Sequence, residues 1–226
     1  MKHLFVFIFV AFLISPAYSQ TDFSGVYGKR EPLSKEMREF FKEQKPVSDD
    51  FGYDLKLILK KVSGFRYKFW LYVNKGFPSY NSGQIDGFVE FKADSALYLL
   101  SDSIYGGCKL LFKNKESSFF VEHDYEYGGC GFGANVTAHG TYPLKSRLVK
   151  TNDIKSVYQF EVEELIIKNA KAFIYSTATE KQPTKQYFIK GDKILNITEQ
   201  EDRIYTEYIS ANGKFISGWI NKGDIQ

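Results

Sequence analysis

The sequence predicts an all-β protein: a meander barrel or bent sandwich of about eight strands with one short helix, followed by a second, smaller β-barrel. Aromatic residues, which favour strands, make up 17% of the 226 residues. Short runs of alternating apolar and polar residues recur between turn residues along most of the chain. Only one segment has helical spacing. The formal net charge of +3 gives no reason to expect a nucleic-acid partner.

The first twenty residues predict a cleaved secretory signal. Lys2 is followed by an apolar run at residues 4–14, by Pro16 and by small residues before the expected cleavage site. The apolar run is shorter than the roughly 20 residues that cross a bilayer, and no later stretch is long and apolar enough. We therefore expect a signal peptide at residues 1–19, no membrane span, and a periplasmic or secreted mature chain.

The elements of the first barrel follow in order. A strand is expected at residues 23–27 and the helix at residues 33–45, with Ser34 as its cap. The helix would place Leu33, Met37, Phe40 and Phe41 on one face. A hairpin then joins residues 53–60 to residues 66–73, through a turn at Ser63 and Gly64.

Five further short strands are expected between residues 84 and 142, each bounded by turn residues. They lie at residues 84–91, 95–100, 109–113, 118–123 and 135–142. Closure of these strands into a barrel would remove exposed sheet edges.

The two cysteines, Cys108 and Cys130, predict one structural disulfide, because an even number of cysteines in an exported chain is most simply paired. Four glycines surround Cys130 and would let the backbone turn tightly beside the bridge. A phosphate-binding loop is the alternative, but it needs a helix after the glycines. The following residues, ANVTAHGTY, alternate as a strand does. The sequence therefore favours a tight turn region held by the Cys108–Cys130 disulfide, which we call the stapled corner.

Catalysis is not expected. A cysteine hydrolase needs a reactive thiolate and a histidine base, and the mature chain has only Cys108, Cys130, His123 and His139 for these roles. The thiols are better used as a bridge. We predict that the protein is not an enzyme, with no catalytic residue and no cofactor.

A metal site is not expected either. The run EHDYEY at residues 122–127 offers one imidazole and three carboxylates. On a strand, however, Glu122 and Asp124 point to the side opposite His123, whereas a zinc site needs convergent ligands. An acidic, solvated strand end is the favoured interpretation.

Several motifs of the first part carry a resemblance. The order is F-S-G-x-Y, G-x-I-x-G at residues 83–87, A-x-Y at 96–98, C-x-L-x-F at 108–112, then CGFGANV and GTY. This order resembles a group of secreted bacterial domains that has no settled activity. The resemblance implies a lipocalin-like β-barrel over residues 20–147.

The C-terminal part carries a second resemblance. The runs AKAFIYS, KQYFIKGDKILNI, RIYTEYIS, ANGK and GWINKGDI are similar to bacterial Src-homology-three-like domains. This implies a small β-barrel over residues 170–226. Residues 148–169 would then form a connection or add an extra strand to the first barrel.

The second resemblance implies binding of cell-wall peptide without chemistry, through exposed aromatic residues. The candidate binding residues are Tyr175, Tyr187, Tyr205, Tyr208 and Trp219. Arg203 departs from the pattern, since many relatives carry an aromatic residue there. We predict an exported, non-catalytic binding protein of the bacterial envelope that contacts peptidoglycan or an envelope protein. The alternatives are a carrier that holds a small apolar ligand in the first barrel and an inhibitor of a wall-degrading enzyme.

Overall fold

The computed structural model describes residues 21–40, 42, 51–101, 106–158 and 162–226. The expected signal peptide lies outside this part of the chain. Among the described residues, no helix has both the length and the apolar character needed to cross a membrane. The protein is all-β, as predicted, with a nearly closed eight-stranded sheet and two smaller sheets.

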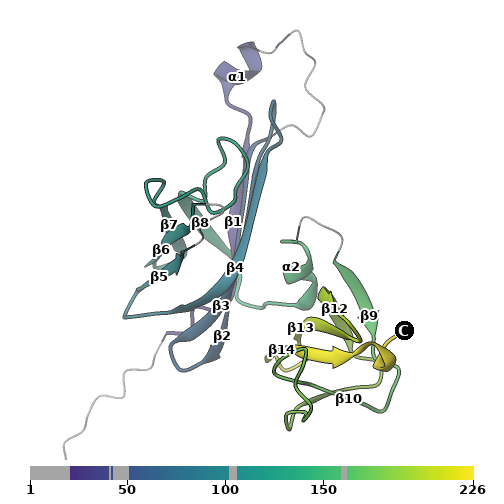
Figure 1. Cartoon of the computed structure of the whole chain (residues 1–226). Coiled ribbons are helices and arrows are strands. Elements are labelled where there is room, and N and C mark those ends of the chain that lie inside the picture. The colour runs from purple at the N-terminus through teal and green to yellow at the C-terminus, as the bar shows by residue number, and fades with distance from the viewer. Residues whose placement is uncertain (1–20, 41, 43–50, 102–105, 159–161) are drawn as a thin grey trace, which may run out of the picture.

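The eight-stranded sheet is an antiparallel meander that returns upon itself (Figure 1). Its order is β4-β3-β2-β1-β8-β7-β6-β5, so that β8 pairs with β1 and only β4 and β5 remain as sheet ends. The strands are β1 (Gly25–Pro32), β2 (Phe51–Ser63), β3 (Arg66–Lys75), β4 (Ser82–Glu90), β5 (Ser95–Leu100), β6 (Cys108–Lys115), β7 (Ser118–His123) and β8 (Gly140–Ser146).

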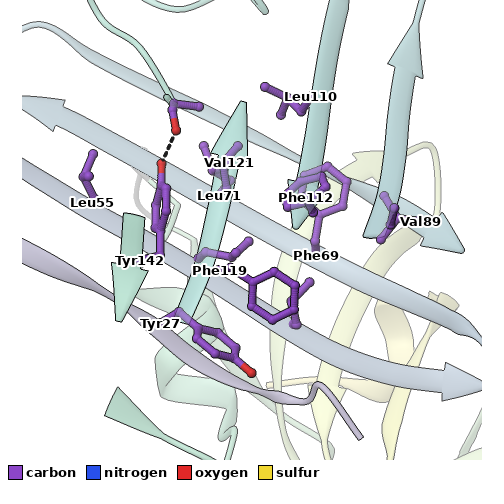
Figure 2. Packing of buried hydrophobic residues seen from close by; sticks show 14 of the residues in the cluster. Tyr27, Leu55, Phe69, Leu71, Val89, Leu110, Phe112, Phe119, Val121 and Tyr142 are labelled. Atoms are coloured by element: carbon purple, nitrogen blue, oxygen red, sulfur yellow. Dashed lines mark hydrogen bonds between the residues drawn. The ribbon is translucent and has the colours of Figure 1, made fainter. Parts of the chain in front are cut away.

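The barrel interior is filled by side chains of its own strands and loops (Figure 2). The alternation expected in β2 and β3 is confirmed: Leu55, Leu57, Leu59, Tyr67, Phe69, Leu71 and Val73 are all buried. The Phe119 ring centroid lies 5.0 Å from that of Tyr27 and 5.7 Å from those of Phe23 and Phe91. Buried hydroxyls find backbone partners, as Tyr142 does by donating to the Ala138 carbonyl at 2.7 Å.

Two aromatic side chains close the open side of the barrel where β4 and β5 diverge. A Cβ atom on Gly87 would lie 2.6 Å from the Tyr98 ring, and a Cβ atom on Gly83 would lie 2.3 Å from the Phe132 ring. Any larger residue at either position would displace a ring. The G-x-I-x-G run therefore lacks side chains where the rings of Tyr98 and Phe132 cover β4.

The expected helix is present as α1 (Lys35–Phe40), and no residue in it is buried. The Ser34 hydroxyl accepts a hydrogen bond from the Met37 amide at 3.2 Å, as expected of a cap. Of the remaining expected helical residues, 41 and 43–45 lie outside the described residues.

The strand expected at residues 135–142 is wrong over its first part, because β8 begins only at Gly140. Asn135 has a φ of 60°, which interrupts an extended strand. Val136 and Ala138 are nevertheless buried. The alternation thus predicts correctly which side chains are buried, although a loop and not a strand directs them into the barrel.

The C-terminal part contains a four-stranded sheet of order β14-β13-β12-β9 and a two-stranded ribbon, β10-β11. Its elements are α2 (Thr151–Lys155), β9 (Glu163–Ile166), β10 (Lys171–Phe173), β11 (Tyr187–Ile189), β12 (Lys193–Gln200), β13 (Arg203–Ile209), β14 (Phe215–Asn221) and the 3-10 turn η2 (Lys222–Asp224). The strand formed within residues 148–169 is β9, which joins this sheet and not the barrel. Ile167, Ile174, Phe188, Ile194, Ile204 and Ile220 are among the residues that fill a core of its own.

A third core joins the two parts. From the outer face of the barrel, Ile58 and Trp70 pack against Ile209 and Phe215 of the C-terminal sheet. Ile154 of α2 completes this shared core from the connecting segment. Figure 1 shows α2 beside the C-terminal strands, next to the barrel. Because every contributor is buried, neither part keeps its apolar surface covered without the other.

Candidate functional site

The disulfide predicted between Cys108 and Cys130 is present, with the two Cα atoms 4.2 Å apart. The Cys130 amide also donates to the Gly107 carbonyl at 3.1 Å. A Cβ atom on Gly128 would lie 1.8 Å from the Gly106 carbonyl oxygen. The glycine-rich run therefore lets two loop backbones touch beside the bridge, as the stapled corner requires.

The residues of the EHDYEY run diverge. Glu122 pairs with Lys113 and Asp124 pairs with Lys109, both at 2.8 Å. His123 is buried on the other side. In the described part of the chain, no three histidine, cysteine or acidic side chains lie close enough to hold a metal ion.

His123 lies against the disulfide corner. Its Nε2 is 3.1 Å from the Gly128 carbonyl oxygen. A carbonyl can only accept, so Nε2 carries the ring proton. Burial lowers the pKa of His123, because the charged form loses hydration. The neutral ring is thus a packing element of the corner.

The C-terminal sheet brings together three of the five predicted aromatic residues, Tyr175, Tyr205 and Trp219. With Arg203 they form what we call the Tyr175 cluster. Tyr175 and Trp219 exchange backbone hydrogen bonds of 2.8 and 3.0 Å, and the Tyr205 and Trp219 rings lie 5.6 Å apart. All four residues are half-buried, so their side chains keep contact with solvent.

Arg203 belongs to the aromatic surface of this cluster. Its guanidinium carbon lies 3.6 Å from the centroid of the Tyr175 ring, a distance at which the flat cation stacks on the ring. One guanidinium nitrogen donates to the Thr177 carbonyl at 3.1 Å and fixes the stack. Compared with the resembled pattern, Arg203 therefore replaces a flat aromatic ring by a flat guanidinium group that carries charge.

Strand alternation explains this placement. Along β13, Ile204 and Thr206 are fully buried, whereas Arg203, Tyr205 and Glu207 share the opposite face. The register of the hairpin sets Tyr205 directly opposite Trp219. An isolated bridge adds Tyr175 beside Trp219.

The other two predicted residues lie elsewhere. Tyr187 is on the β10-β11 ribbon, 41% exposed, with the Lys171 ammonium 4.4 Å from its ring centroid. The Tyr208 hydroxyl donates to the Asp192 carboxylate at 3.2 Å. Neither residue extends the Tyr175 cluster.

A buried charge network lies close to Tyr205 of the cluster, and the sequence analysis did not predict it. The Glu207 carboxylate accepts from Trp70 Nε1 at 2.8 Å and from the Tyr158 hydroxyl at 2.9 Å. It also pairs with the Lys68 ammonium at 3.1 Å, and Lys68 pairs with Asp86 as well. Lys68 and Glu207 are only 5% and 1% exposed. Lys68 and Trp70 lie on the barrel, whereas Glu207 lies on the C-terminal sheet, so the network joins the two parts.

The electrostatics of the network are balanced. Burial alone would lower the pKa of Lys68, but the nearby Glu207 and Asp86 carboxylates outweigh it and raise that pKa. Burial also raises the pKa of Tyr205, which neighbours the same charges. The charged form of Lys68 is therefore stabilised close to Tyr205 of the cluster.

The chemistry available in the cluster is recognition. It offers aromatic faces for stacking and guanidinium donors for a carboxylate, and none of its four residues is a hydroxyl or thiol nucleophile paired with a base. In comparisons with known proteins, no family model matches the chain, and neither a curated protein nor a solved structure proved similar to it.

Proposed function

We propose that the protein is an exported, non-catalytic binding protein of the bacterial envelope, whose Tyr175 cluster contacts cell-wall peptide or a partner protein. The observation that carries the proposal is the stack of Arg203 on Tyr175 beside the half-exposed Trp219 ring. The resemblance of residues 170–226 to bacterial Src-homology-three-like domains supports it. A periplasmic or secreted location follows from the signal-like residues 1–19.

The arginine also specifies the ligand chemistry. Guanidinium groups bind carboxylates through paired hydrogen bonds, while the adjacent rings of Tyr175 and Trp219 provide flat apolar surface. A peptide with a free carboxylate next to an apolar or flat group satisfies both. Such a ligand needs no cofactor.

The packed barrel interior favours this function over carriage of a small apolar ligand. Twenty-one buried residues form one cluster inside the barrel. A ligand held there would have to displace rings such as Phe69 and Phe112, whose centroids are 5.1 Å apart. Displacing packed rings costs several kcal/mol.

The test is co-sedimentation of the mature chain, residues 20–226, with purified cell-wall sacculi. The whole mature chain is needed because the shared core covers the C-terminal sheet. We expect Arg203→Glu to weaken binding at least about tenfold, or 1.4 kcal/mol. Lys171→Glu is the matched control, since it reverses a charge over a different tyrosine ring. Absence of wild-type binding, or equal binding by Arg203→Glu, would count against the proposal.

A further inference from the structure

The two end strands of the barrel sheet meet only at their turn. Lys92 and Ser95 exchange backbone hydrogen bonds of 2.8 and 3.2 Å. Beyond this bridge, no ladder joins β4 to β5 among the described residues. The gap is covered from within by the Tyr98 ring. Within the described residues, one edge of β5 therefore presents backbone N–H and C=O groups that no neighbouring strand uses.

A groove on the outside of the barrel runs along the first part of this edge, as far as Leu97. It has a volume of about 540 Å³, and its lining includes Phe88 and Val89 of β4, Ala96 and Leu97 of β5, and Leu111 of β6. Apolar residues of three strands thus line the groove, together with Ser95 and with Lys92 from the turn between β4 and β5. A segment that enters the groove would lie alongside β5.

The edge lacks the features that usually protect one. Natural edge strands carry charged residues, proline or a bulge, but β5 reads SALYLL and carries none of these. Leu97, Leu99 and Leu100 are 52%, 54% and 43% exposed. An unprotected strand with leucines on its outer face is suited to pairing with another strand.

The charges in the groove distinguish the possible occupants. Arg66 lies over the Phe88 ring at 4.4 Å, and Lys92 lines the same end of the groove. Neither cation makes an ion pair within the described residues, and Glu90 is the one acidic residue in the lining. A second copy of this chain would bring its own β5, which has no charged residue. A segment with an acidic residue complements the groove better.

We propose that β5 is a docking edge for an extended segment of another protein, which adds a strand to the barrel. Its outward residues are apolar where they lie beside Leu97 and Leu99. At least one aspartate or glutamate lies toward Arg66 and Lys92. Backbone hydrogen bonds to β5 supply affinity, and the alternate side chains supply selectivity. This surface is distinct from the Tyr175 cluster.

The test is selection of a displayed library of random ten-residue segments against the mature chain. We expect enrichment of sequences that alternate apolar residues with at least one acidic residue. The double variant Leu97→Lys, Leu99→Lys should weaken binding of a selected peptide at least tenfold. Leu148→Lys is the matched control, because Leu148 is 58% exposed and lies neither on β5 nor in the groove. Binding should also slow hydrogen exchange at the β5 amides.

Three results would overturn the proposal. One is a selection that enriches no sequence, and another is a peptide that binds the double variant as well as the wild type. The third is dimerisation in sedimentation equilibrium that the double variant abolishes, since a second copy would then cover the edge. Arg203→Glu should retain peptide binding, which separates this result from a failure of the proposed cell-wall function.

Discussion

The barrel interior and the junction between barrel and C-terminal sheet are both buried, but they are built differently. The interior consists of aromatic and aliphatic side chains whose few hydroxyls reach backbone acceptors. The junction sets a lysine and a glutamate among apolar residues and connects them to an indole and a phenol. The interior depends on how much apolar surface it removes from water. The stability of the junction depends in addition on a specific ion pair and on specific hydrogen bonds.

This difference determines how precisely the C-terminal sheet is positioned on the barrel. Apolar packing tolerates rearrangement when volume is kept, whereas a buried ion pair is costly in any arrangement that separates its members. The Lys68 and Glu207 pair therefore ties the C-terminal sheet to one position on the barrel. Arg203 and Tyr205 of the Tyr175 cluster lie on the same face of β13 as Glu207, so the ion pair also fixes the position of the cluster relative to the barrel.

The largest expected effect is loss of packing in the interior. Phe119→Ala removes a fully buried ring that contacts the rings of Phe23, Tyr27 and Phe91. We expect the free energy of unfolding to fall by about 4 kcal/mol. Urea unfolding followed by tryptophan fluorescence measures it, with the exposed Phe65→Ala as control. A loss below about 1 kcal/mol would show that the interior is not tightly packed.

The second largest effect on the free energy of unfolding is expected at the junction between the barrel and the C-terminal sheet. Glu207→Gln removes the charge that faces the buried Lys68 and should lower the free energy of unfolding by about 3 kcal/mol. The double variant Lys68→Met, Glu207→Gln should lose less, because the glutamine oxygen still accepts from Trp70 and Tyr158 and no buried charge is left unpaired. Asp86, the other partner of Lys68, is partly exposed to solvent. The same urea titration compares them. If the double variant were the less stable of the two, the junction would owe its stability to the ion pair itself.

The smallest effect concerns pH. The lowered pKa of His123 means that, below its ordinary pKa of about 6.5, the unfolded chain takes up a proton that the folded chain does not. Stability is therefore full above that pH and falls as the pH drops from 7 to 5. The melting temperature should follow this slope. His123→Gln should flatten it and the exposed His139→Gln should retain it. The opposite outcome would mean that the imidazole accepts a proton inside the fold.

The sequence predicted the parts of the fold that alternation encodes locally. Alternate residues of β3, Tyr67, Phe69, Leu71 and Val73, face the barrel interior as expected, and the two cysteines are bonded. Residues 135–139 alternate equally well, yet they form a loop, because burial on alternate positions does not require a neighbouring strand. The left-handed backbone at Asn135 interrupts the extended conformation, and the alternation of apolar residues does not encode it.

The candidate site was predicted in part. Tyr175, Tyr205 and Trp219 were expected as candidates, and strand register brings them together. Tyr187 and Tyr208 were expected with equal reason, since composition alone does not say which face of the sheet a tyrosine occupies. The pairing of Lys68 with Glu207 has no local pattern, because the two residues lie in different sheets far apart along the chain.

The shared core has a consequence for the order in which the molecule can be completed. Trp70 lies in the third strand, but Ile209 and Phe215, which cover it, come close to the C-terminus. A growing chain can therefore form its first hairpins while the indole is still in water. The newly made barrel therefore exposes this apolar surface until almost the last residues are added. A chain that ends before Phe215 would tend to aggregate, even though all strands of its barrel are present.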